Sequence, residues 1–145
     1  MLLGETGFIK EARIWLRRFG GNLFQLHPFA ASAAMRFDQA LKQMPKYLER
    51  TKKVCNILKN IPGISILPDP PQVNMFHAYF SASAEKLTRA RDEIAKADKI
   101  WLANRFQSTA LENQAYTEIY AGEGLLKVPD EELFGAFSKL IKLAA

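Results

Sequence analysis

The sequence predicts an α+β fold, in which three N-terminal helices precede a small, mostly antiparallel sheet with helices on one side. Apolar residues recur every three or four positions over the first 60 residues, which is typical of amphipathic helices. Later stretches are instead rich in aromatic and β-branched residues, as strands are. Helical periodicity returns between and after these stretches, and this order favours one layer of helices packed on one sheet.

The first helix is expected over residues 6–19, with Gly20 and Gly21 ending it because glycine readily adopts left-handed backbone. A second helix is expected from Pro28 to Met44, since proline suits the first turn of a helix. It is rich in alanine, which lets another helix or subunit approach closely. Pro45 is expected to separate it from a third helix, over residues 45–61.

Four strands and two further helices complete the expected order. The strands are expected within residues 64–71, 73–81, 100–109 and 115–122, and the helices over residues 83–96 and from Pro129 onward. The strand within residues 73–81 is apolar on both faces, which predicts cover on both sides. Asp130, Glu131 and Glu132 occupy the first turn of the last helix, where they complement its dipole.

The amino-acid composition indicates a globular protein. The chain has 145 residues, 48% of them hydrophobic and 24% charged, and these values are typical of one globular domain. We find no apolar run long enough to span a bilayer and no signal-peptide pattern, so the expected compartment is the cytoplasm. A single cysteine, Cys55, fits a reducing environment.

The formal net charge of +5 is compatible with nucleic-acid binding without predicting it. Lys42, Lys46, Arg50 and Lys53 recur at helical spacing and share one face. A solvated helix face is the preferred interpretation, with a phosphate-binding surface as the alternative. No zinc-finger, RNP or KH pattern accompanies these residues.

The sequence shows no self-contained active site. His27 and His77 lie far apart and lack the spacing of zinc ligands, so no metal site is expected. We interpret His77 as a core residue, His27 as a cap or interface residue, and Cys55 as a buried apolar residue. No catalytic residue is therefore assigned.

Two long segments resemble the threonine-aldolase and β-eliminating-lyase family of pyridoxal-phosphate enzymes. The first is "GFIKEARIWLRRFGGNLFQLHPFAASAAMRF", whose Arg-Gly-Gly stretch is its most specific part. The second is "IWLANRFQSTALENQAYTEIYAGEGLLKVPDEEL", which is similar to the final strands and closing helix of those enzymes. The resemblance implies the C-terminal part of a fold-type-I subunit.

The same resemblance implies a division of the chain. Residues 1–60 would form a helical segment leading from a large domain that is missing here, and residues 61–145 the small α+β domain. The parallel sheet, the cofactor cradle and the Schiff-base lysine would lie upstream, so this chain alone is expected to be inactive.

Site residues are implied by the resemblance as well. Arg17 and Arg18, with Gly20 and Gly21, would approach the phosphate of pyridoxal 5'-phosphate. The alternative is that the two arginines only neutralise the carbonyl end of their helix. Phe24 stands where the family commonly has a second arginine, so the phosphate contacts or the substrate are expected to differ.

Arg105 is the candidate for binding the substrate carboxylate, because it is the only strand arginine expected in the second half. The implied function is a pyridoxal-phosphate-dependent lyase, of the aldolase or β-eliminating type, that acts on an α-amino acid in a homodimer or homotetramer. The alternatives are a non-catalytic protein-interaction module and a basic nucleic-acid-binding domain. Neither nucleic acid nor membrane is expected as a partner of the lyase.

Overall fold

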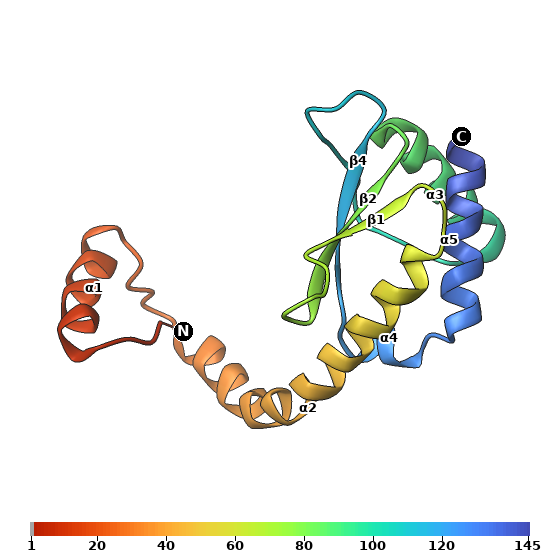
Figure 1. The fold of residues 1–145 in the computed structure, drawn as a ribbon. Coiled ribbons are helices and arrows are strands. Elements are labelled where there is room, and N and C mark those ends of the chain that lie inside the picture. Colours follow the sequence, from red (N-terminus) through yellow and green to blue (C-terminus); the bar gives the residue numbers. More distant parts are fainter. Residues whose placement is uncertain (1) are drawn as a thin grey trace. The chain divides into compact units, whose positions relative to one another are not determined.

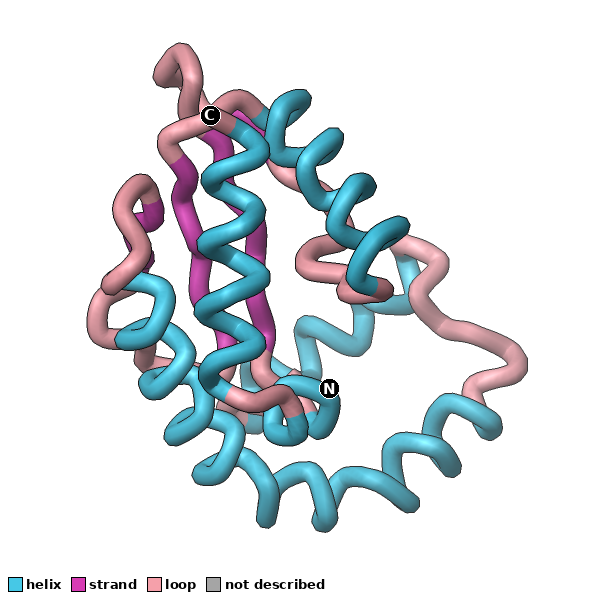
Figure 2. The backbone as a smooth tube through the Cα atoms, turned by 90° about the vertical axis from the view of Figure 1, so that its right-hand side faces the viewer, coloured by secondary structure: helices cyan, strands magenta, loops and turns pink. Residues whose placement is uncertain are grey.

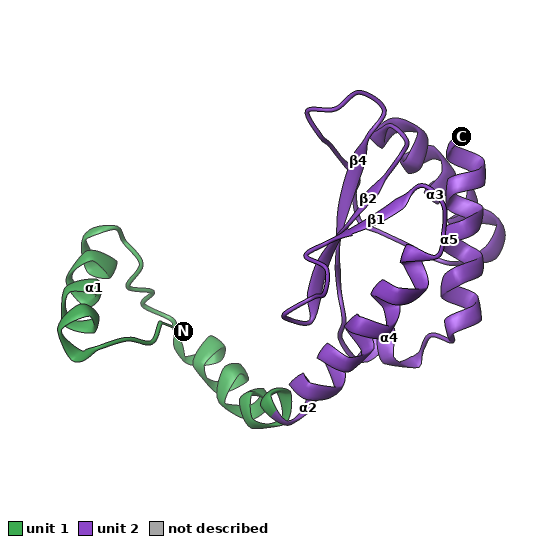
Figure 3. Cartoon of the chain, in the orientation of Figure 1, with its two compact units in different colours: residues 1–41 green, residues 42–145 purple. Residues whose placement is uncertain are grey.

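The computed structural model describes residues 2–145 and divides into two compact units, Met1–Leu41 and Lys42–Ala145 (Figure 3). The first unit contains helix α1 (Thr6–Arg18) and the first part of helix α2 (His27–Lys59). The second contains the rest of α2 and every strand. The division at residue 60, which the resemblance implies, concerns function and stays a prediction.

Helix α2 corrects the expected separation at Pro45. The prediction of two helices, over residues 28–44 and 45–61, is wrong, because α2 is one helix of 33 residues with Pro45 inside it. A proline within a helix removes the hydrogen bond to the carbonyl four residues earlier, here that of Leu41. The helix formers around Pro45, including Leu41, Lys42 and Leu48, continue the helix across this missing bond. The boundary between the two units lies just before Pro45, between Leu41 and Lys42.

The second unit contains a four-stranded antiparallel sheet in the order β1-β2-β4-β3. The strands are β1 (Ile64–Leu67), β2 (Met75–Phe80), β3 (Gln107–Ser108) and β4 (Ala115–Tyr120). The central pair, β2 and β4, is in register along all six residues of each strand. The expected antiparallel sheet is confirmed.

Helices α3 (Ala84–Asp98) and α5 (Asp130–Ala144) cover one face of this sheet, and α5 runs along the strands (Figures 1 and 2). Ser83 begins α3, where its hydroxyl accepts a hydrogen bond from the backbone N–H of Lys86. A short helix that the sequence did not predict, α4 (Glu123–Lys127), links β4 to α5. The largest fully buried core side chains come from α2, β2, α3 and α5: Val54, Leu58, Phe76, Phe80, Leu87, Ile94 and Leu140.

The other face of the sheet is open, which corrects the expectation that both faces of residues 73–81 are covered. Phe76 and Phe80 point to the helices and are 1% exposed, whereas His77 and Tyr79 alternate with them and are half-buried. His77 is therefore not a core residue. Side chains on a strand alternate between faces, so one apolar strand can serve a core and an open surface at once.

Candidate functional site

A polar hollow of about 180 Å³ lies at the outer edge of the sheet, beside β4. Its lining consists of Asn104, Arg105, Gln107, Thr117 and Glu118. Arg105, the predicted substrate-binding residue, is exposed at this hollow. The structure thus brings it together with the carboxylate of Glu118 and three other polar residues, none of which the sequence had indicated.

The hollow exists because β3 is short. Strand β3 pairs only with Ala115 and Tyr116, so no strand pairs with the outer edge of β4 from Thr117 onward. An irregular segment, residues 103–106, runs beside that edge instead. There the Thr117 hydroxyl donates a 2.8 Å hydrogen bond to the carbonyl oxygen of Arg105.

The prediction of a strand over residues 100–109 is wrong, because β3 is much shorter than that range. Only Gln107 and Ser108 join the sheet. The carbonyl groups just before them accept hydrogen bonds from side chains, which replace the ladder that a neighbouring strand would provide. Arg105 consequently lies on a loop and not on a strand.

Both signs of charge meet at this hollow. The Arg105 guanidinium carries the positive charge, and its planar fork matches the two oxygens of a carboxylate. The Glu118 carboxylate lies on the open face of the sheet, where its Oε2 is 3.7 Å from Nε2 of His77. An arginine and a glutamate around one hollow can hold the carboxylate and the ammonium group of a free amino acid.

Aromatic side chains pack together on the open face, in contact with two residues that line the hollow. The Tyr79 and Tyr116 rings stack with their centroids 5.3 Å apart, and the Tyr116 hydroxyl donates a 3.2 Å hydrogen bond to Oε1 of Gln107. His77 packs edge-on against Tyr116. These rings form an aromatic cluster beside Gln107 and Glu118.

The predicted phosphate-binding residues lie in the other unit, where α1 ends. Arg17 and Arg18 are exposed, and the Arg18 guanidinium lies over the Trp15 ring, 4.9 Å from its centroid. Among the described residues, no carboxylate forms an ion pair with either arginine. Both guanidinium groups can therefore accept an anion.

Gly20 and Gly21 form the corner after these arginines. Gly20 has a positive φ of 71°, which favours glycine, and a Cβ on Gly21 would lie 2.5 Å from Cδ1 of Leu16, whose exposed side chain would have to move. Their backbone N–H groups donate to the carbonyls of Arg17 and Leu16. The glycines thus shape the corner with their amides already bonded, which leaves the arginine side chains as the groups that fit a phosphate.

The remaining candidates do not form a site within residues 2–145. No group of three or more metal-ligating side chains occurs there, and none of the described helices is both long and apolar enough to cross a bilayer. Cys55 is a buried core residue, as predicted, and burial is the main cause that raises its pKa to about 11. A thiol with so high a pKa is a poor nucleophile.

Two residues on the basic face of α2 form ion pairs inside the second unit. Arg50 and Lys53 both form ion pairs with Asp130, at 2.5 and 2.7 Å. Arg50 also donates to the backbone carbonyls of Leu125 and Val128, and its side chain is only 9% exposed. It is therefore a buried link between α2 and the start of α5, and not the solvated surface charge that its spacing predicted.

The chain is similar to two proteins of known structure. No protein-family model and no curated protein matches the chain. Among solved structures, it is similar to a protein assigned as an L-allo-threonine aldolase from Listeria monocytogenes, with a TM-score of 0.79 and 28% identity. It is also similar to a protein assigned as an aromatic amino acid β-eliminating lyase/threonine aldolase from an Exiguobacterium species, with a TM-score of 0.78 and 25% identity.

The chain resembles the threonine aldolases and β-eliminating lyases. This confirms the resemblance seen in the sequence, and it extends over 97% of the chain in both comparisons. The chain spans only 39% of the length of either neighbour, which is consistent with a C-terminal part.

Proposed function

We propose that this chain is the small-domain part of a pyridoxal-phosphate-dependent lyase, of the threonine-aldolase or β-eliminating type, that acts on an α-amino acid. The observation that supports this most strongly is the structural likeness to two such proteins along 97% of the chain. The Schiff-base lysine and the large domain would come from outside these 145 residues, so the chain alone would be inactive.

In this proposal Arg105 binds the substrate carboxylate and Glu118 faces the amino group. A charge-assisted hydrogen bond from an arginine fork fixes both the position and the direction of a carboxylate. That orientation decides which bond at the α-carbon breaks, while pyridoxal phosphate, when bound, supplies the electron sink. The role of the hollow in this proposal is thus to orient the substrate carboxylate.

Arg17 and Arg18 would hold the cofactor phosphate. Their exposure and lack of carboxylate partners among residues 2–145 support this role. Trp15 offers a local reporter, because Arg18 lies on its ring. With W101F as the background, Trp15 is the sole tryptophan, and adding pyridoxal phosphate should quench its fluorescence. The quench should weaken in R17M and R18M and persist in R13M, which removes an exposed arginine one turn earlier.

The first unit also supports the proposal of a homo-oligomer. None of residues 2–41 is buried, and Phe8 and Trp15 of α1 and Phe19 just after it are 55%, 51% and 82% exposed. Apolar side chains exposed together on one segment are typical of a contact surface. Light scattering over a range of protein concentrations should therefore report a dimer or tetramer.

The experiment that tests the proposed function uses the protein purified as its gene encodes it. Supplied with pyridoxal phosphate, it should retain the cofactor through gel filtration, show its absorbance band, and cleave or eliminate from a β-hydroxy-α-amino acid. A protein that retains no cofactor and turns over no amino acid would overturn the proposal. Retention without turnover would instead support a role in cofactor binding and overturn the lyase assignment.

A further inference from the structure

Arg91 is the buried charged residue of the second unit that the proposed function leaves unused. It lies on α3, it is 7% exposed, and its neighbours on the inner face of that helix, Ala90 and Ile94, belong to the core. A buried guanidinium has to satisfy its donors within the protein. In Arg91 all three nitrogen atoms of the guanidinium have partners.

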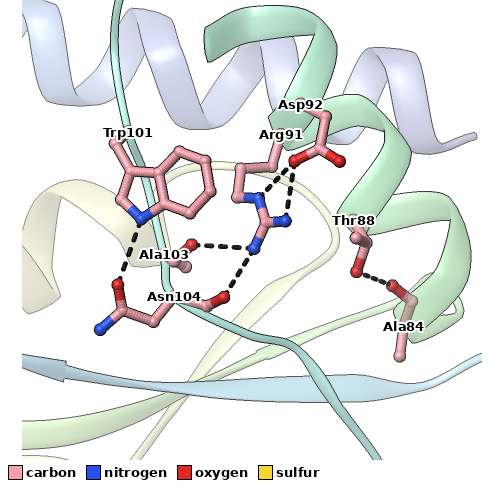
Figure 4. A network of polar contacts seen from close by, with 7 residues as sticks. All are labelled: Ala84, Thr88, Arg91, Asp92, Trp101, Ala103 and Asn104. Atoms are coloured by element: carbon pink, nitrogen blue, oxygen red, sulfur yellow. Dashed lines mark hydrogen bonds and ion pairs between the residues drawn. The ribbon is translucent and has the colours of Figure 1, made fainter.

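The guanidinium of Arg91 connects α3 to the loop that contains Trp101, Ala103 and Asn104 (Figure 4). Its Nε and Nη2 donate to Oδ1 of Asp92, at 2.9 and 2.7 Å. Its Nη1 donates to the carbonyl oxygens of Ala103 and Asn104, at 3.1 and 2.7 Å. Its flat face lies on the Trp101 ring, 4.3 Å from the centroid.

Trp101 also contacts a second residue of this network, Asn104. Its indole N–H donates a 3.2 Å hydrogen bond to Oδ1 of Asn104, so Asn104 is bonded to Arg91 through its backbone and to Trp101 through its side chain. The segment that contains Trp101, Ala103 and Asn104 has no strand or helix of its own. Its shape therefore depends on Arg91, which is held on a helix anchored in the core.

We propose that Arg91 is the positioning residue of the hollow: it fixes the loop that presents Arg105 to a carboxylate ligand. Arg105 follows directly after the two carbonyl groups that Arg91 holds, and its own carbonyl is held by Thr117. The backbone of Arg105 is thus fixed on both sides, while its side chain remains exposed. Groups that bind a ligand with fixed geometry need such support from rigid neighbours.

A lysine cannot replace this arginine. Lysine keeps the positive charge, but a single ammonium cannot bond Asp92 on one side, two carbonyls on the other, and still stack on Trp101. Loss of the loop contacts should move Arg105 while leaving the sheet and its helices in place. The effect should therefore appear in ligand binding at a hollow that Arg91 does not itself line.

The proposal rests on the proposed function, because it takes the hollow as the site for a carboxylate. The experiment uses the chain of 145 residues, labelled with ¹⁵N, and titrates acetate and then glycine as probes. The readouts are the amide signals of Gln107, Thr117 and Glu118 and the side-chain Nε–H signal of Arg105. Thermal unfolding and the amide signals of α3 and α5 report whether each variant keeps its fold.

In the wild-type chain the probes should shift these signals saturably, and R91K should weaken the affinity about tenfold, the loss expected when one charge-assisted hydrogen bond is misplaced. D92N, at a more exposed position, should weaken binding in the same direction with little risk to folding. The matched control is R89K, since Arg89 lies two residues away on α3, is exposed, and pairs only with Glu85 among the described residues.

The outcomes separate the two proposals. Weaker binding in R91K and D92N, with unchanged signals from α3 and α5 and no effect of R89K, would support the positioning role. Equal affinity in the wild type, R91K and D92N would overturn it and leave the proposed function standing. A wild-type chain whose hollow binds neither probe would overturn the carboxylate site and with it the positioning role.

Discussion

The hydroxyl of Thr117 and the carbonyl of Arg105 are joined by a 2.8 Å hydrogen bond that takes the place of a strand pair at the edge of β4. Thr117 is 3% exposed, so its hydroxyl would be an unsatisfied buried donor without this partner. The bond explains how an irregular segment remains beside a regular strand. It also places an arginine side chain at the rim of the hollow.

T117V should loosen this segment, because valine has nearly the same shape and no hydroxyl. We expect a loss of about 1 kcal/mol in the free energy of unfolding, the usual net contribution of one hydrogen bond. Amide exchange at Arg105 and Phe106 should become faster. T117S keeps the hydroxyl and serves as the control, and equal exchange rates in T117V and T117S would contradict the role of the bond.

Removing the carboxylate of Asp130 should make the unfolding free energy depend less on pH. Hydrogen bonds from Arg50 and Lys53 lower the pKa of Asp130 below its ordinary value of 3.8. A lowered pKa stabilises the folded state above pH 3.8, and this stabilisation is lost as the pH falls through the folded pKa. D130N should therefore be less stable than the wild type at neutral pH, with the difference shrinking below pH 3.8.

Urea unfolding at a series of pH values measures this difference. E112Q is the control, because it removes an exposed carboxylate from the loop between β3 and β4 without touching Arg50 or Lys53. A constant gap between D130N and the wild type from neutral pH to about pH 2 would show that the ion pairs do not stabilise the fold.

Cys55 should resist thiol reagents in the folded protein. Burial raises its pKa to about 11 from an ordinary value of 9.0, and the residue is 1% exposed. Labelling at neutral pH should therefore be slow and should accelerate in denaturant. Because the folded pKa is the higher one, this thiol should also reduce stability as the pH rises from 9 to 11, a loss that C55A should lack. Fast labelling of the native chain would contradict the buried position.

F80A and Y79F together test which face of the sheet is covered. Phe80 packs edge-on against Phe106 and stacks near Phe137, so F80A should lower the free energy of unfolding by about 3–5 kcal/mol. Tyr79 is the adjacent residue on the open face, and Y79F should cost less than about 0.5 kcal/mol. Comparable losses in the two variants, measured by chemical denaturation, would mean that both faces are packed.

The sequence predicted the elements whose periodicity and caps agree with their packing. Helix α5 is the best example, since its start after Pro129 and its acidic first turn both match the structure. The antiparallel sheet was predicted as well, through aromatic and β-branched stretches. Local pattern and tertiary packing point the same way in these elements.

The predictions that failed depend on partners distant in the sequence. Residues 100–106 look like a strand, but Arg91 and Thr117 take the carbonyl groups that a strand would use. Pro45 is the exception, because α2 continues through it on the helix propensity of its local neighbours. Arg50 looks like a surface charge, although its partner Asp130 lies 80 residues away.

The hollow could be predicted only in part. Arg105 was a candidate because of its chemistry, whereas Glu118 was not, since the hydrogen bond from Thr117 that holds the Arg105 backbone beside β4 is not visible in the sequence. The only charged side chain within the strand "AYTEIY" was the signal that could have identified Glu118.

The most direct test of the proposed lyase role is the kinetic effect of R105M in the protein purified as its gene encodes it and supplied with pyridoxal phosphate. If Arg105 holds the substrate carboxylate, KM for a β-hydroxy-α-amino acid should rise at least tenfold, about 1.4 kcal/mol, and R105K should recover part of the loss. The exposed arginine control, R89M, should leave both kcat and KM unchanged. Unchanged KM in R105M would contradict the assignment of the hollow as the substrate site.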